Sequence, residues 1–79
     1  MKYDTHELKT WPEYFELVVQ RKKNFEVRRN DRDFKVGDLL WLREYSHESG
    51  YTGRETGRFI AYILDNPDFV KEGYVILSF

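Results

Sequence analysis

Hydrophobic and polar positions follow a helical period in the first part of the chain. Thr10 and Glu13 have the spacing of a capping box, and Pro12 suits the first turn of a helix. We therefore expect a helix from Pro12 to about Arg21. One side of this helix is apolar and is predicted to lie in the core, and its residues are Trp11, Phe15, Val18 and Val19.

The period changes to two in the segment Asn24–Arg28, which predicts a strand. Phe25 and Val27 then point to one side and are expected to face the core. Glu26 and Arg28 share the opposite face, about 7 Å apart along the strand.

Short apolar segments separated by turn residues make up the rest of the chain. They predict a mostly-β, α+β fold: a single domain over residues 1–79 with one main helix after the first strand and about five strands in a small antiparallel β-barrel. The expected elements are a strand at Tyr3–Leu8, turns at Arg29–Asp33 and Val36–Asp38, a strand at Leu39–Tyr45, a hairpin loop at Ser46–Gly57, and strands at Arg58–Leu64 and Tyr74–Phe79.

Composition excludes several classes of function. The chain has no cysteine, so a disulfide framework, a thiolate metal site and a cysteine nucleophile are excluded. His6 and His47 lack the paired spacing of metal ligands, and we expect no metal and no cofactor. No signal peptide or apolar run of about 18 residues is present, so we expect a soluble, cytoplasmic protein without membrane contact.

The net charge of −1 hides an uneven distribution. Residues 21–32 hold six basic and two acidic side chains, whereas the rest of the chain holds seven basic and twelve acidic ones. A basic segment on an acidic body suits an anionic ligand. A solvated run of charges with no function is the alternative interpretation.

Within this segment, Lys23, Glu26 and Arg28 are candidate site residues. A carboxylate between two cations stays ionised, and the cations still meet a phosphate. The same three residues also suit a functionally silent surface ion pair. The sequence leaves both possibilities open.

The predicted loop supplies a second candidate site. Tyr51, Arg54 and Arg58 combine one aromatic ring with two guanidinium groups, and glycines between them permit close backbone approach. Single-stranded RNA sites use such side chains because unstacked bases lie on aromatic or arginine planes. An ordinary mobile hairpin loop is the alternative.

The order Lys23-x-x-Glu26-x-Arg28 after a helix resembles the signature of ASCH domains, a branch of the PUA-like superfamily. That signature carries a glycine where this chain has Arg21. The resemblance, to a small bacterial and phage ASCH-related family, covers nearly the whole chain. Its other segments are His6–Lys9, Asn30–Phe34, Val36–Asp38, Tyr51–Arg54 and Gly73–Ser78.

The resemblance implies a PUA-like barrel with an RNA-binding cleft lined by Lys23, Glu26 and Arg28. Some ASCH relatives are amidohydrolases that deacetylate N4-acetylcytidine nucleosides with a lysine at the position of Lys23. In those enzymes a threonine stands at the position of Glu26, and the region that holds a further catalytic glutamate is shortened here.

Three hypotheses follow from the sequence. The leading one is a binding module for RNA or a nucleotide, with phosphate contacts from Lys23, Arg28, Arg32 and Arg54. The second is a small amidohydrolase acting on modified nucleosides, with Lys23 as nucleophile or base and Glu26 shuttling protons. The third is a protein-interaction domain without a nucleic-acid ligand.

Overall fold

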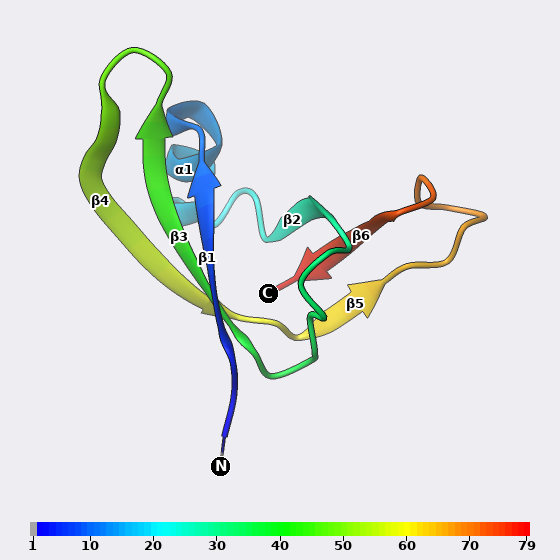
Figure 1. Ribbon diagram of the computed structural model, residues 1–79. Helices are drawn as coiled ribbons and strands as arrows, with labels where there is room; N and C mark the ends of the chain where they lie inside the picture. Colours follow the sequence, from blue (N-terminus) through cyan, green and yellow to red (C-terminus); the bar gives the residue numbers. More distant parts are fainter. Residues whose placement is uncertain (1) are drawn as a thin grey trace.

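The computed structural model describes residues 2–79, and these form one helix and six strands (Figure 1). The predicted mostly-β, α+β class with one helix after the first strand is therefore confirmed. The strands belong to two three-stranded sheets. In chain order the elements are β1 (Thr5–Thr10), α1 (Pro12–Val19), β2 (Phe25–Arg29), β3 (Leu39–Ser46), β4 (Gly50–Phe59), β5 (Tyr62–Leu64) and β6 (Tyr74–Ser78).

The first sheet has the order β1-β3-β4 and contains both strand directions. β1 pairs in parallel with β3, from Thr5 opposite Leu39 to Thr10 opposite Glu44, and β3 pairs antiparallel with β4. A parallel pair needs a crossover connection, which here contains α1 and β2. The prediction of a wholly antiparallel fold is therefore wrong for β1, whose partner is not its neighbour in the sequence.

The second sheet has the order β2-β6-β5 and is antiparallel throughout. Its inner face meets the inner face of the first sheet and one side of α1 in a shared hydrophobic core. Phe34, in the connection between β2 and β3, completes this core. Its buried members are Leu8, Val18, Phe34, Leu40, Leu42, Ile60, Val75 and Leu77.

The two sheets are not closed into a barrel. Across the described residues, no backbone ladder joins the free edge of β1 to β2. Arginine side chains bridge this boundary, which we call the seam: Arg28 Nη2 donates to the Lys9 carbonyl at 2.7 Å, and Arg32 Nη1 donates to the Glu7 carbonyl at 2.5 Å. The predicted barrel is therefore wrong, because side-chain donors take the place of a strand pair.

The helix begins at Pro12 as predicted, but its cap differs from the prediction. Trp11 is the N-cap residue, and no side chain makes a capping hydrogen bond. Thr10 is the last residue of β1 and points inward, with 3% of its surface exposed. The predicted capping box of Thr10 and Glu13 is therefore wrong, because strand pairing fixes the direction of the Thr10 side chain.

The helix ends at Val19, two residues before the expected end at Arg21. The Arg21 amide donates to the Val18 carbonyl at 3.0 Å, and the Lys22 amide donates to the Leu17 carbonyl at 2.9 Å. These two bonds form a Schellman motif, and Arg21 has the left-handed conformation that the motif requires, with φ 60°. Within residues 2–79 no helix is long and apolar enough to cross a membrane.

The predicted hairpin loop Ser46–Gly57 is mostly strand, because β4 begins at Gly50. Gly50 and Gly53 have positive φ values of 75° and 93°, so the glycines shape the turn and an irregularity within the strand. At Gly57 an added Cβ would lie 3.3 Å from a methyl group of Leu39. The glycines here permit turning and close packing rather than a long mobile loop.

The predicted strand Arg58–Leu64 is divided between the sheets. β4 ends at Phe59 in the first sheet, and β5 begins at Tyr62 in the second. Ile60, between them, is 2% exposed and belongs to the core. One apolar segment of the sequence therefore contributes a strand to each sheet. The buried Ile60 lies where the chain passes from the first sheet to the second.

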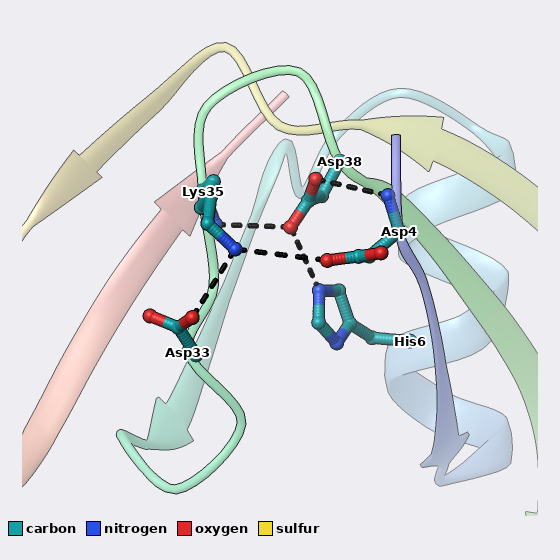
Figure 2. Close-up of polar contacts among 5 residues, drawn as sticks. All are labelled: Asp4, His6, Asp33, Lys35 and Asp38. Atoms are coloured by element: carbon teal, nitrogen blue, oxygen red, sulfur yellow. Dashed lines mark hydrogen bonds and ion pairs between the residues drawn. The ribbon is translucent and has the colours of Figure 1, made fainter. Parts of the chain in front are cut away.

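A buried polar cluster joins the start of β1 to the segment before β3 (Figure 2). Asp38 Oδ2 lies 2.9 Å from His6 Nε2 and 3.1 Å from the Lys35 amide, and Oδ1 accepts from the Asp4 amide at 3.1 Å. Burial alone would raise the pKa of Asp38, but the hydrogen bonds from His6 and both amides outweigh it and lower that pKa. The Lys35 ammonium, 3.1 Å from Asp33, closes the cluster at the surface.

Candidate functional site

A pocket opens on the seam where the end of β1, the start of α1 and β2 meet. Its volume is about 480 Å³, within the range of about 300–1,000 Å³ that is usual for small-molecule sites. We call it the seam pocket. Its lining residues are Lys9, Thr10, Trp11, Tyr14, Lys23, Glu26, Val27 and Arg28.

The two faces of β2 are reversed relative to the prediction. Phe25 and Val27 are 42% and 50% exposed, whereas Glu26 is 5% exposed. Glu26 lies opposite Leu77 of β6, which is fully buried, so the Glu26 side chain shares the inner face of that sheet. The assignment of Phe25 and Val27 to the core is wrong, because Glu26 and Arg28 line the inner side of the seam and find partners there.

Lys23, Glu26 and Arg28 converge in the seam pocket. Lys23 Nζ donates to Glu26 Oε2 at 3.0 Å and to the Phe25 carbonyl at 2.7 Å. Arg28 Nη2 lies 3.8 Å from Glu26 Oε1, beyond hydrogen-bond distance. The Lys23 and Glu26 side chains are 15% and 7% exposed, so this ion pair is largely removed from water.

Three buried polar atoms of the pocket residues have no hydrogen-bond partner among residues 2–79. They are Thr10 Oγ1, Glu26 Oε1 and Arg28 Nε. Buried polar atoms are normally paired, and each unpaired one costs about 1–3 kcal/mol. All three such side-chain atoms in the described chain belong to residues of this pocket, which makes it the candidate site.

Aromatic rings form the wall at the start of α1. Trp11 and Tyr14 stack with their ring centroids 6.2 Å apart and their planes 20° apart. They are 48% and 43% exposed, so ring surface stays accessible to a ligand. His47, in the turn between β3 and β4, meets Trp11 edge-on, with the two ring centroids 5.0 Å apart.

Arg32 borders a second, smaller cavity that also touches Arg28. Tyr51, Arg54 and Arg58 line neither cavity. The structure therefore brings Lys23, Glu26 and Arg28 together, places Arg32 beside them, and leaves the other three elsewhere.

Tyr51, Arg54 and Arg58 each contact other residues of the chain, which lie on β3, β4 and α1. The Tyr51 ring lies beneath the Arg43 guanidinium at 4.0 Å. Arg54 Nη1 is 3.2 Å from Glu16 and 3.6 Å from Glu44, both carboxylates. Their role in RNA binding stays a prediction.

Arg58 lies toward the helix end rather than at the seam. Its Nη2 donates to the Val18 carbonyl at 3.4 Å, and its Nη1 donates to Thr56 Oγ1 at 2.7 Å. Burial lowers the pKa of the Arg58 guanidinium, and the nearby charge of Arg21 lowers it further. These contacts bind Arg58 to its own chain, and its predicted ligand role also stays a prediction.

Sequence reasoning missed part of the pocket. The sequence pattern predicts a cap at Thr10 and a core position for Trp11, and it predicts no role for Tyr14. These residues lie directly before the first turn of α1 or within it, twelve or more residues from Glu26 in the sequence. No pattern of neighbouring residues therefore indicates that they share a site with Glu26. The signal available in the sequence was a pair of aromatic residues, Trp11 and Tyr14, at the expected helix start.

In the part of the chain that the structure describes, no group of three or more His, Cys, Asp or Glu side chains could hold a metal ion. The polar groups of the seam pocket are one carboxylate, three cations, two hydroxyls and the indole N–H of Trp11. This set offers hydrogen-bond donors, acceptors and charge to an organic or phosphate-bearing ligand.

Comparison with known proteins finds one family model and one curated relative. An uncharacterised 12.9 kDa protein in the GpA 3′ region of Escherichia phage P2 is 39% identical over 72 residues, which are 91% of this chain. The chain spans 64% of the length of that relative. The family model, described as a domain of unknown function, DUF3850, matches residues 5–79. The chain therefore belongs to the DUF3850 family.

Proposed function

We propose that this chain binds RNA or a nucleotide in the seam pocket. The observation that carries the proposal is the meeting of Lys23, Glu26 and Arg28 in one concave site beside exposed aromatic rings. RNA-binding proteins recognise unpaired bases by stacking on aromatic side chains and by hydrogen bonds to base edges. The seam pocket offers both aromatic rings and hydrogen-bonding groups in its lining.

Each group then has a distinct role. A base stacks on Trp11 or Tyr14, where stacking contributes about 1–3 kcal/mol per base. Glu26 Oε1, which has no hydrogen-bond donor among the described residues, accepts from an amino or imino group of the base. Lys23 uses two of its three N–H donors within the chain, and the third remains for a phosphate oxygen.

The charge distribution and the resemblance support the same proposal. The basic segment 21–32 lies on a chain that is otherwise acidic, so a polyanion is attracted to one region and repelled elsewhere. The resemblance to ASCH domains of the PUA-like superfamily points to RNA as the polyanion. Such a ligand, and a chain without cysteine, fit a cytoplasmic location.

The test is a titration of labelled, short single-stranded RNA, followed by fluorescence anisotropy at several salt concentrations. Affinity should fall steeply as salt rises, because released counterions drive phosphate binding. Trp11→Ala should weaken binding by about fivefold or more through lost stacking. Phe69→Ala, which removes a 77% exposed ring that lines neither cavity, is the matched control and should bind normally. A lack of salt-dependent binding at low ionic strength would remove the proposal.

One contact favours a second candidate function, hydrolysis of an amide on a modified nucleoside. Lys23 Nζ lies 3.0 Å from Glu26 Oε2, so a proton can pass between an amine and a carboxylate inside the pocket. In this reaction water adds across the amide C–N bond, and its proton passes to the leaving nitrogen by way of Glu26. The products are a carboxylic acid and the free amine.

The assay for this activity is incubation with N4-acetylcytidine and chromatography for cytidine and acetate. Turnover by the intact protein that is lost in Lys23→Ala supports hydrolysis. If the intact protein releases no cytidine while it still binds RNA, the chain is a binding module only.

A further inference from the structure

A second cavity continues the seam beyond Arg28, on the side away from α1. Its volume is about 130 Å³, below the range of about 300–1,000 Å³ usual for whole small molecules. It therefore suits a single chemical group. Arg28 borders both this cavity and the seam pocket, and the full lining is Leu8, Arg28, Arg29, Asp31, Arg32 and Phe34.

Two guanidinium groups are held in fixed positions at this cavity. Arg28 and Arg32 each donate to a carbonyl on the free edge of β1, those of Lys9 and Glu7. An arginine has five N–H donors, and each of these side chains uses one of them in that bond. The remaining donors stay available, so the carbonyls orient the guanidinium groups without saturating them.

The charges around the cavity favour an anion. The Arg29 guanidinium lies 5.4 Å from the Tyr74 ring and 3.4 Å from its hydroxyl, so it is directed to the other face of β2. Arg28 and Arg32 remain as the cations, against the one carboxylate of Asp31. Paired guanidinium groups are well suited to phosphate because their planar forks bind two oxygens at once.

We propose that this cavity is the phosphate subsite of the seam pocket. A base occupies the seam pocket, and a phosphate of the same nucleotide or of its neighbour occupies the space between Arg28 and Arg32. This inference rests on the proposed function and narrows it. The ligand is a phosphorylated nucleotide or an RNA strand, and a free nucleoside lacks one of the two recognised groups.

The test compares four ligands by calorimetry: ribonucleosides, their 3′-monophosphates, their 5′-monophosphates and short single-stranded RNA. A phosphate should raise affinity about tenfold or more, as expected for charge-assisted hydrogen bonds. The two monophosphates and the diester-linked strand show which phosphate fills the subsite. Inorganic phosphate should compete with the nucleotides and leave nucleoside binding unchanged.

Two variants sharpen the comparison. Arg32→Gln should remove the gain that the phosphate provides and leave nucleoside affinity unchanged. Lys71→Gln, the matched control, removes a cation that lies 5.4 Å from the Tyr74 ring and lines neither cavity, and it should retain the gain. A thermal melt of each variant confirms that it folds.

The outcomes separate the two proposals. Equal affinity for nucleosides and nucleotides, or equal loss of both in Arg32→Gln, would overturn the phosphate subsite and leave base binding standing. Absence of binding by every ligand would overturn the proposed function itself. A phosphate gain that is lost only in Arg32→Gln supports both.

Discussion

Two buried carboxylates of this chain have nearly the same exposure and opposite surroundings. Asp38 is 4% exposed and Glu26 is 5% exposed. Asp38 accepts hydrogen bonds from His6 and from the amides of Asp4 and Lys35, so both of its oxygens are paired. Glu26 is paired at Oε2, whereas Oε1 has no hydrogen bond among residues 2–79.

The difference separates a structural cluster from a candidate site. The donors of the chain itself complete the Asp38 cluster, which ties the start of β1 to the segment before β3 (Figure 2). Glu26 borders a pocket of about 480 Å³, and Thr10 and Arg28 leave further buried polar atoms unpaired there. Unpaired buried groups reduce stability, so their concentration at one pocket is typical of a functional site.

The largest expected effect comes from breaking the paired cluster. Asp38→Asn removes a buried charge and replaces one acceptor oxygen by an NH2 group that faces one or two of the three donors, so the free energy of unfolding should fall by about 2–4 kcal/mol. Urea denaturation measures this. Affinity for RNA, measured on the folded variant, should be unchanged. A loss below about 0.5 kcal/mol would contradict the structural role, since that is the scale of ordinary surface substitutions.

The pH dependence of stability is a smaller consequence of the same cluster. The pKa of Asp38 is lowered in the folded state below the usual aspartate value of 3.8. Its contribution to stability is therefore present above pH 4 or so and is lost as the pH falls through the lowered folded-state pKa. Denaturation between pH 5 and pH 2.5 should show a shallower decline for Asp38→Asn than for the unaltered protein.

An exposed carboxylate provides the control for that measurement. Hydrogen bonds from Gln20 and Arg54 lower the pKa of Glu16, but this side chain lies at the surface. Water screens its interactions, so Glu16→Gln should leave the acid dependence nearly unaltered. Equal changes in Glu16→Gln and Asp38→Asn would show that the buried cluster has no special part in acid stability.

The smallest expected effect concerns the turn that leads into the pocket. Arg21 occupies the left-handed position of the Schellman motif, with φ 60°, where glycine is usual. Arg21→Gly relieves that strain, and after the added entropy of the unfolded chain the net gain should be about 0.5–1 kcal/mol. The melting temperature should rise by about 2–8 °C. RNA affinity should stay the same if Arg21 acts only in the turn, and a lower melting temperature would contradict this account.

Local signals in the sequence were sufficient for much of the fold. The Pro12 helix start and the strand at Leu39 depend on neighbouring residues, and both were predicted correctly. Alternation along β2 was also predicted, but alternation cannot say which face is buried. The inward position of Glu26 depends on Lys23, on Arg28 and on the facing sheet, and this tertiary information inverted the expected faces.

The sequence predicts those residues of the candidate site that are close together in the chain. It does not predict those that only the folding of the chain brings together. Lys23, Glu26 and Arg28 lie within six residues and were recognised together. Thr10 and Tyr14 join them only across the seam, where Arg28 of β2 donates to the Lys9 carbonyl of β1. No spacing in the sequence indicates that these residues lie close to Glu26 in the folded chain.

We infer that the unpaired polar atoms of the seam pocket are kept for a ligand. Two matched valine variants at threonine positions distinguish this from a purely structural role. Thr10 Oγ1 is buried without a partner, whereas Thr52 Oγ1 donates to Glu44 at 2.6 Å. Both the free energy of unfolding and the affinity for single-stranded RNA are measured for each variant.

Thr10→Val should raise the free energy of unfolding by about 1 kcal/mol, because an unpaired buried hydroxyl is removed, and should weaken RNA binding about fivefold. Thr52→Val should lower the free energy of unfolding by about 1–2 kcal/mol and leave binding unchanged. If Thr10→Val destabilises the protein or binds RNA as well as the unaltered chain does, the seam pocket is not a ligand site of the kind proposed.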